Sequence, residues 1–239
     1  MDYDYVKFSD EMKKLNVILT NDQIDQFIDF YKLLIEKNKV MNLTAITGFE
    51  EVMEKHFLDS LSVTYVFHLN QPDLKVIDLG TGAGFPGIPL KIVFPDINIL
   101  LVDSLNKRVQ FLNEVISELG LKKINTLHAR AEDIAKDRRY REQFNLCVSR
   151  AVANLSTLSE YCIPFVKENG YFISYKSGQI ETEAEQAKKA VSRLGGELER
   201  IHKFDLYEQK RSFVLIRKVS ATPKKYPRKA GIPSREPLM

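Results

Sequence analysis

An α/β fold with a seven-stranded, mostly parallel sheet is predicted by three features of this 239-residue sequence. From about residue 71 onward, short apolar segments alternate with helical patterns, as in sheets whose parallel strands are joined by helices. A glycine-rich turn follows the first apolar segment, where open α/β sheets bind ligands. The last two apolar runs, near 198–206 and 211–218, are joined by the short link YEQK, which favours an antiparallel hairpin.

Residues 1–70 contain only helical patterns and form a predicted N-terminal helical region. Asn21 or Asp22 can cap a first helix, and a second helical pattern runs from Phe49 to Phe67. The apolar positions of the first helix, which recur at helical spacing, are Ile24, Phe27, Ile28, Tyr31, Leu34 and Ile35.

Residues 71–220 form the predicted α/β domain, and residues 221–239 form a separate tail. The other predicted strands of the domain are 74–79, 97–103, 124–128, 144–149 and 170–175. The predicted helices are 87–94, 105–119, 153–167 and 180–194. The almost wholly apolar run before Asp103 is typical of a parallel strand that is buried on both faces.

The segment from Leu74 to Gly87, LKVIDLGTGAGFPG, is the most informative motif of the chain. Glycine lets the backbone turn sharply off a strand and lets a ligand contact the main chain directly. The helix that follows directs its first amide groups at the same place. The cofactor-binding residues expected from this motif are Asp78, Gly80, Gly82, Gly84 and Phe85.

Three interpretations of this motif are open: a methyl-donor site, a dinucleotide site and a structural turn without a ligand. The string GAGFPG also satisfies the GxGxxG pattern of dinucleotide sites. However, Asp78 directly precedes the turn, and Pro86 removes an amide from the first helical turn. A carboxylate suits S-adenosylmethionine, which carries an ammonium and a sulfonium, better than a pyrophosphate. The motif therefore favours S-adenosylmethionine as cofactor.

Asp103 ends the next predicted strand, about 20 residues after the glycines. Doubly wound folds place an acid at this point to accept hydrogen bonds from ribose hydroxyls. The alternative is an unused surface acid. Because such an acid serves nicotinamide cofactors as well, Asp103 supports the fold more than the choice of cofactor.

Arg150 follows the apolar strand FNLCVS directly and is therefore expected beside the cofactor, at the carboxyl end of the sheet. It is the catalytic and cofactor-binding candidate, because its planar fork can hold a phosphate or a base edge. The alternative is a structural ion pair with Asp103, Asp78 or Glu132. Glu132 and Asp133 are expected to flank the adenine, although the same residues are compatible with a capped helix start. Ala131 and Glu132 are cofactor-binding candidates.

Candidate substrate-binding residues come from three parts of the chain. They are Asn42, His56, Lys176, Lys224, Lys225, Arg228 and Lys229. His56 lies three residues before Asp59 on a predicted helix, hence on the same face, where a packing role is the alternative. The tail carries five basic residues against one acid, and its four prolines argue against a helix. Such a tail attracts phosphates, although an ordinary solvated terminus is the alternative.

Composition sets further limits. The net charge of +3 does not by itself indicate nucleic-acid binding. Cys147 and Cys162 lie in apolar surroundings without CxxC spacing, and the four histidines are scattered, so no metal site is expected. No apolar run approaches the roughly 20 residues that span a bilayer, and the N-terminus lacks a signal-peptide core. A cytoplasmic protein without a membrane partner is expected.

Five sequence strings together resemble the RsmG family of bacterial methyltransferases, over essentially the whole chain. They are DLGTGAGFPGIPL, the HFLDS of His56–Ser60, the RAED of Arg130–Asp133, the SRA of Ser149–Ala151 and the C-terminal YPRKAGIPSREPL. The resemblance implies a Rossmann-like class I methyltransferase with S-adenosylmethionine as cofactor. It also implies that guanine-N7 in 16S ribosomal RNA is methylated, in naked RNA or in a small ribosomal subunit at some stage of assembly. The oligomeric state and the exact nucleotide stay open.

The residues after the fourth strand agree with guanine-N7 as acceptor. Enzymes that methylate exocyclic amines use an (Asp/Asn)-Pro-Pro-aromatic loop there, whereas this chain has SRAV. Carbon-5 methylation needs a cysteine nucleophile, yet Cys147 falls inside the strand. Guanine-N7 needs positioning rather than a base, because its lone pair is already available. The alternatives are a small-molecule methyltransferase, which would lack salt-sensitive RNA binding, and a noncatalytic RNA-binding module that binds cofactor without turnover.

Overall fold

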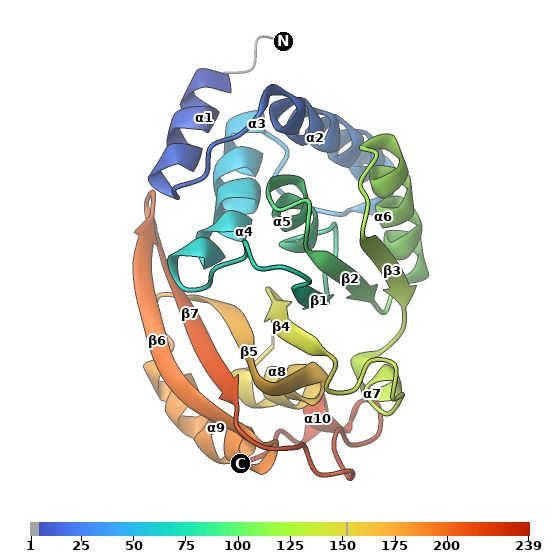
Figure 1. Ribbon diagram of the computed structural model, residues 1–239, viewed down its shortest axis with the longest axis vertical. Helices are drawn as coiled ribbons and strands as arrows, with labels where there is room; N and C mark the ends of the chain where they lie inside the picture. Colours follow the sequence, from blue (N-terminus) through green and yellow to red (C-terminus); the bar gives the residue numbers. More distant parts are fainter. Residues whose placement is uncertain (1–4, 152) are drawn as a thin grey trace.

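The computed structural model describes residues 5–151 and 153–239. Within these residues, seven strands form one sheet in the order β3-β2-β1-β4-β5-β7-β6 (Figure 1). The first five strands are parallel, and β7 runs antiparallel to both β5 and β6. The strands are β1 (Lys75–Leu79), β2 (Asn98–Asp103), β3 (Ile124–His128), β4 (Phe144–Ser149), β5 (Val166–Ser177), β6 (Gly196–Leu206) and β7 (Gln209–Lys218). The predicted sheet with its antiparallel final hairpin is confirmed.

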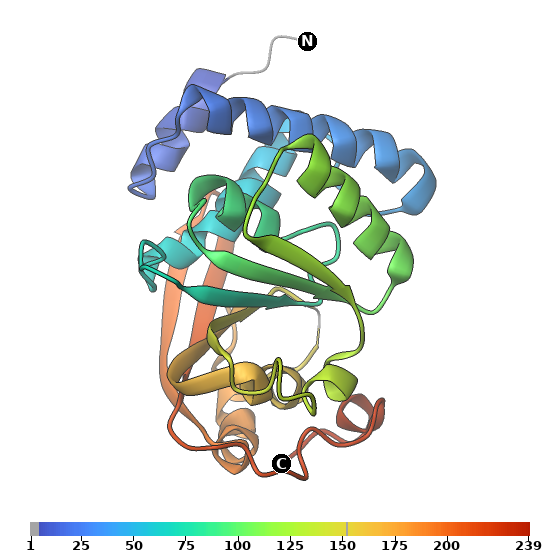
Figure 2. The ribbon, with the colours of Figure 1, turned by 45° about the vertical axis from the view of Figure 1, so that its right-hand side comes forward.

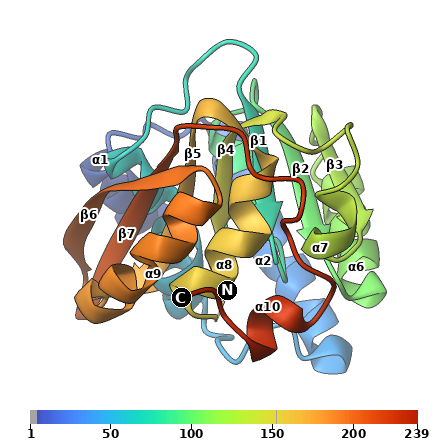
Figure 3. The ribbon, with the colours of Figure 1, turned by 90° about the horizontal axis from the view of Figure 1, so that it is seen from below.

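Helices cover both faces of the sheet. In chain order they are α1 (Tyr5–Lys14), α2 (Asn21–Met41), α3 (Phe49–Val52), η1 (Met53–Leu58), α4 (Asp59–Leu61), η2 (Ser62–Tyr65), α5 (Gly87–Val93), α6 (Asn106–Glu118), α7 (Ala131–Ile134), α8 (Leu155–Cys162), η3 (Ile163–Phe165), α9 (Glu181–Arg193) and α10 (Ile232–Arg235). Figure 2 shows α1, α2, α5 and α6 on one side of the sheet, and Figure 3 shows α8 and α9 on the other.

The N-terminal helices share a hydrophobic core with the α/β part. Phe27 and Phe57, from the first 70 residues, belong to the same buried cluster as Ile88 and Phe111 from α5 and α6. The rings of Phe27 and Phe57 lie 4.9 Å apart. The predicted boundary near residue 70 falls between η2 and β1, but side chains on its two sides pack into one core.

Two helices differ from their predicted form. The helix α2 is capped by Thr20, whose hydroxyl accepts from the Gln23 amide, rather than by Asn21 or Asp22. The predicted helix over 49–67 contains a π-helical stretch, η1, which carries His56.

The predicted helix over 153–167 is shorter than expected. The helix α8 ends at Cys162, the short 3-10 helix η3 follows, and β5 begins at Val166. Pro164 explains the early end, because proline lacks an amide donor and disfavours a helical residue before it.

The tail packs along the protein rather than extending into solvent. Figure 3 shows the chain after β7 continuing past α8 and α9 to α10. The Arg228 guanidinium pairs with the fully buried Glu160 carboxylate of α8 at 2.7 Å. The expectation that prolines exclude a helix is also wrong, because Pro233 lies in the first turn of α10, where its missing amide costs no helical bond.

Candidate functional site

A cavity of about 720 Å³ lies at the carboxyl ends of β1, β2 and β4. Its walls come from the glycine turn, the end of β2, the start of α7, the chain after β4, and residues before and within α10. The sequence-predicted residues that line it are His56, Gly80, Gly82, Phe85, Asp103, Ala131, Glu132 and Arg150. The lining does not include Asn42, Asp78, Gly84, Lys176, Lys224, Lys225, Arg228 or Lys229.

The glycine turn presents main chain to the cavity. Gly80 and Gly82 have φ angles of 72° and 62°, in the region that favours glycine. A Cβ on Gly82 would meet no atom of another residue within 4 Å apart from its chain neighbours, so this backbone faces open space. Gly84 has a different role, because a Cβ there would lie 2.6 Å from Ile88 Cγ1. This geometry fits a ligand that lies against the backbone at Gly80 and Gly82.

Asp78 lies beneath the turn instead of facing the cavity. Its carboxylate is fully buried, and Oδ2 accepts from the Thr81 hydroxyl at 2.7 Å and the Gly87 amide at 2.9 Å. Oδ1 has no hydrogen-bond partner among the described residues. Burial raises the pKa of this carboxyl to about 7, despite the two donated hydrogen bonds. In this position Asp78 holds the turn rather than contacting a ligand.

Replacing Asp78 with asparagine is expected to remove a pH dependence of stability. Between its usual pKa of 3.8 and about 7, the folded carboxyl binds more protons than the unfolded one. The free energy of unfolding of the native protein therefore falls as pH rises through this window, by about 1.4 kcal/mol per unit of pKa difference. The amide introduced by Asp78→Asn would keep an acceptor for Thr81 and Gly87 without this loss. Denaturant titrations from acidic to neutral pH measure this difference between the native protein and Asp78→Asn, with the exposed Asp133→Asn as control. The same pH dependence of the free energy of unfolding in the native protein and in Asp78→Asn would contradict the prediction.

Asp103 lies at the cavity wall and organises the neighbouring loops. Its carboxylate, only 3% exposed, accepts from the Gly82 amide at 2.9 Å and from the Leu105 amide at 2.9 Å. The Arg108 guanidinium lies 3.4 Å from Oδ2. Asp103 is therefore no unused surface acid, and it couples the end of β2 to the glycine turn.

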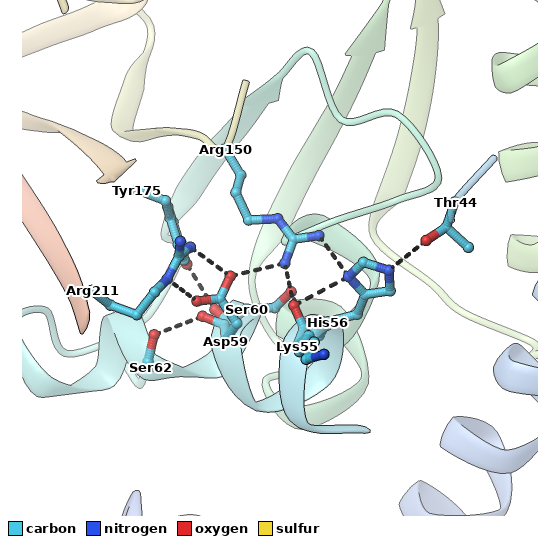
Figure 4. A network of polar contacts seen from close by, with 9 residues as sticks. All are labelled: Thr44, Lys55, His56, Asp59, Ser60, Ser62, Arg150, Tyr175 and Arg211. Atoms are coloured by element: carbon cyan, nitrogen blue, oxygen red, sulfur yellow. Dashed lines mark hydrogen bonds and ion pairs between the residues drawn. The ribbon is translucent and has the colours of Figure 1, made fainter. Parts of the chain in front are cut away.

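Arg150 pairs with an acid that the sequence did not indicate as its partner. Its guanidinium donates to Asp59 Oδ2 at 2.9 Å and to the Lys55 carbonyl at 3.2 Å (Figure 4). It also lies 5.0 Å over the centre of the Phe85 ring. Among the described residues, the ion-pair partner of Arg150 is therefore Asp59 and not one of the three acids suggested by the sequence, which were Asp78, Asp103 and Glu132. The reason is that the N-terminal helices bring Asp59 to the end of β4.

Asp59 holds two arginines. Its carboxylate is 3% exposed and also receives two hydrogen bonds from Arg211 of β7, at 2.7 and 2.9 Å. Figure 4 shows the Arg150 and Arg211 side chains converging on this carboxylate from two different elements. The signal for Asp59 in the sequence was its spacing from His56. Arg211 carried no comparable signal.

His56 both packs and lines the cavity. Its ring stacks on Phe85 with centroids 4.6 Å apart, and Nε2 lies 2.8 Å from the Thr44 hydroxyl. The Arg150 guanidinium lies 3.3 Å from Nδ1. Burial, followed by the charge of Arg150, lowers the pKa of His56 to about 4. The imidazole is therefore neutral at pH 7.

Several predicted substrate contacts are already engaged within the protein. The Lys176 ammonium donates to the Ala153 carbonyl and to Glu183, at 2.6 and 2.7 Å. Asn42 is exposed and ends α2 in the left-handed conformation. The tail lysines at 224, 225 and 229 are exposed, in contrast to the paired Arg228. Of the tail's basic residues named as candidates, only these three lysines are left facing solvent.

Glu132 ties the tail to the cavity. Its carboxylate accepts from the Gly231 amide at 3.0 Å, and both residues line the cavity. Ser234 of α10 also belongs to the lining. No sequence pattern indicated that the tail contributes a wall of the cavity.

Across residues 5–151 and 153–239, no group of three or more His, Cys, Asp or Glu side chains is arranged to hold a metal ion. None of the helices in these ranges has the length and apolar character that a bilayer span requires.

The sheet order, the exposed glycine backbone and the acid at the end of β2 define an S-adenosylmethionine-dependent methyltransferase of Rossmann-like fold. The chain belongs to the GidB family, described as rRNA small subunit methyltransferase G, whose family model matches residues 23–214. Membership confirms the resemblance seen in the motifs and the expectation of an rRNA methyltransferase.

Individual proteins agree with this membership. Ribosomal RNA small subunit methyltransferase G of Lachnoclostridium phytofermentans is 51% identical over 97% of this chain and 96% of its own length. The protein of the same name from Staphylococcus aureus is 48% identical over 97% of each chain. Among solved structures, M. jannaschii TYW2 in complex with AdoMet has a TM-score of 0.55 at 13% identity, covering 73% of this chain and 80% of that one. TrmN from Thermus thermophilus has a TM-score of 0.52 at 14% identity, covering 70% and 53%. The two structures support the fold.

Proposed function

We propose that this protein transfers a methyl group from S-adenosylmethionine to guanine-N7 of 16S ribosomal RNA, in the cytoplasm. Its substrate is the RNA itself or the small ribosomal subunit that contains it. The observation that carries the proposal is a single cavity with two different walls. Exposed backbone at Gly80 and Gly82 forms one wall with Asp103, and Arg150 with His56 forms the other.

The first wall suits the cofactor. Gly80 and Gly82 let a ligand lie against the main chain without a side chain in between, while their amides donate to the Val102 carbonyl and the Asp103 carboxylate. Asp103 retains acceptor capacity for ribose hydroxyls, since a carboxylate has about four lone-pair positions. Ala131 and Glu132 are placed beside them, where the adenine would lie. When bound, S-adenosylmethionine supplies an activated methyl group.

The second wall suits a neutral nucleobase that is methylated without losing a proton. Guanine-N7 attacks through an in-plane lone pair, so the protein must orient the base and tolerate developing positive charge. His56, with its pKa lowered to about 4, is a weak base and stays neutral. Arg150 is the candidate catalytic residue, because its guanidinium, held by Asp59, can donate to the guanine O6 or to a phosphate and leave the N7 lone pair free. The exposed Lys224, Lys225 and Lys229 are candidates for RNA phosphates.

Replacing Asp103 with alanine is expected to weaken S-adenosylmethionine binding by about 1–3 kcal/mol, the usual loss for a charge-assisted hydrogen bond. The change also leaves the Gly82 and Leu105 amides without their acceptor. Titration calorimetry measures the affinity, and Asp25→Ala, which removes an exposed acid of α2, is the control. An unchanged affinity in a folded variant would remove Asp103 from the cofactor site.

Mass mapping of methylated bases in 16S ribosomal RNA from cells with and without this protein tests the function. The expected result is one 7-methylguanine that disappears when the gene is deleted and returns with the native protein. Cofactor binding without any lost modification would favour the noncatalytic RNA-binding module. Turnover with a small acceptor, together with an unchanged rRNA, would favour the small-molecule enzyme.

A further inference from the structure

A second groove lies at the same edge of the sheet as the cofactor cavity. It encloses about 720 Å³ between the chain that follows β5, the end of β6 and the start of β7. Ser177 at the end of β5 pairs with Arg211 of β7, and Arg211 pairs with Phe204 of β6. Because β4 and β5 are parallel, the end of β5 lies at the edge where β4 ends in Arg150. None of the predicted site residues lines this groove.

The groove is basic. Lys203, Lys210 and Arg211 line it, against one acid, Asp205. Lys203 forms an ion pair with Glu181 at its outer side, and both side chains are more than half exposed. The Lys210 ammonium forms no ion pair within the described residues, and its residue is exposed. Asp205 lies opposite Lys210 in the strand register, whereas Arg211 shares the single carboxylate of Asp59 with Arg150. Among these residues one positive charge is therefore left over where the groove meets the cavity, and it attracts an anion.

The groove and the cofactor cavity are joined through one carboxylate. Arg211 lines the groove, and Arg150 lines the cavity. Both donate to Asp59 Oδ2 at 2.9 Å, so their nitrogens are separated by no more than two hydrogen-bond lengths. The part of the groove at Arg211 is therefore adjacent to the cavity wall that Arg150 forms, and a strand with one nucleotide in the cavity can continue into the groove.

We infer that this groove binds the phosphate backbone of the RNA strand next to the target guanosine. The inference rests on the proposed function for its ligand, because it extends the same substrate into a neighbouring site. Lys210 neutralises a phosphate as a mobile point charge, and Lys203 does so when its ammonium turns from Glu181 to the phosphate. Arg211, which Asp59 holds in place, orients the strand where the groove meets the cavity. The groove thereby adds affinity and register, and the methyl transfer takes place in the neighbouring cavity.

The test is the salt dependence of binding to 16S ribosomal RNA by Lys203→Ala, Lys210→Ala and the double variant. Each lost phosphate contact is expected to flatten the plot of log affinity against log salt by about 0.7–0.9. Lys210→Ala is expected to show this full change and Lys203→Ala, whose ammonium is already paired with Glu181, a smaller one, with the double variant showing the sum. The KM for RNA is expected to rise, with unchanged S-adenosylmethionine affinity. The control is Lys167→Ala, which removes an exposed lysine at the opposite end of β5.

The outcomes separate this inference from the proposed function. A wild-type protein that methylates 16S ribosomal RNA neither alone nor in the small ribosomal subunit contradicts the function. If the wild type is active but the groove variants keep the salt slope of Lys167→Ala, the groove does not bind RNA. A flattened slope in Lys224→Ala or Lys229→Ala, but not in the groove variants, would place the phosphate contacts on the tail and also overturn the inference.

Discussion

Replacing Arg228 with methionine is expected to lower the free energy of unfolding by about 3 kcal/mol or more, because it leaves a buried charge without a partner. Glu160 is fully buried, and three hydrogen bonds from the Arg228 guanidinium, at 2.7 to 3.1 Å, compensate its charge. Chemical denaturation measures the loss. Lys229→Met is the matched control, since it removes an exposed neighbouring charge and is expected to change stability by less than about 0.5 kcal/mol.

A second variant identifies the cause. Adding Glu160→Gln to Arg228→Met removes the uncompensated charge, and part of the stability is expected to return. The affinity for S-adenosylmethionine is also expected to fall in Arg228→Met, because Gly231 and Ser234, which line the cavity, lie on the segment that this pair anchors. Equal unfolding midpoints for the Arg228 and Lys229 variants would show that the tail is held by other contacts.

Replacing Asp59 with asparagine is expected to reduce turnover at least about tenfold, equivalent to roughly 1.4 kcal/mol of transition-state stabilisation. The carboxylate is the anion shared by Arg150 and Arg211, and an amide can neither neutralise both guanidinium groups nor accept all their hydrogen bonds. Arg150 would then lose its fixed position beside the cavity. The free energy of unfolding is expected to fall by about 3–5 kcal/mol, as for other broken buried ion pairs.

Steady-state kinetics under conditions in which the variant stays folded separate the effect on turnover from the effect on the free energy of unfolding. A positioning role for Asp59 predicts a lower kcat with nearly unchanged S-adenosylmethionine affinity. Glu51→Gln, which removes an exposed acid from the same helical segment, is the control and should leave kcat unchanged. Normal kcat in folded Asp59→Asn would mean that Arg150 needs no partner to act. Arg150→Met should then show whether the arginine acts at all.

The sequence alone predicted the strands, the final hairpin and the cavity's first wall. These features depend on local chemistry. The run before Asp103 is apolar because both faces of its strand are buried, and the turn at Gly80 and Gly82 needs positive φ angles. Asp103 follows from its place at the end of a strand. The sequence can predict the place of a side chain when that place follows from the strand or turn to which the residue itself belongs.

The tertiary structure decided which charges meet. Arg150 lies 91 residues from Asp59, and Arg211 lies 152 residues from it, yet all three share one buried cluster. Arg228 reaches Glu160 across 68 residues, and a tail for which the sequence suggested phosphate contacts or free solvation thereby forms a wall of the cavity. For a charged side chain, the sequence gives the sign of the charge and the length of the side chain, but not its partner. Its partner depends on which segments the hydrophobic core brings together, and burial there makes pairing obligatory.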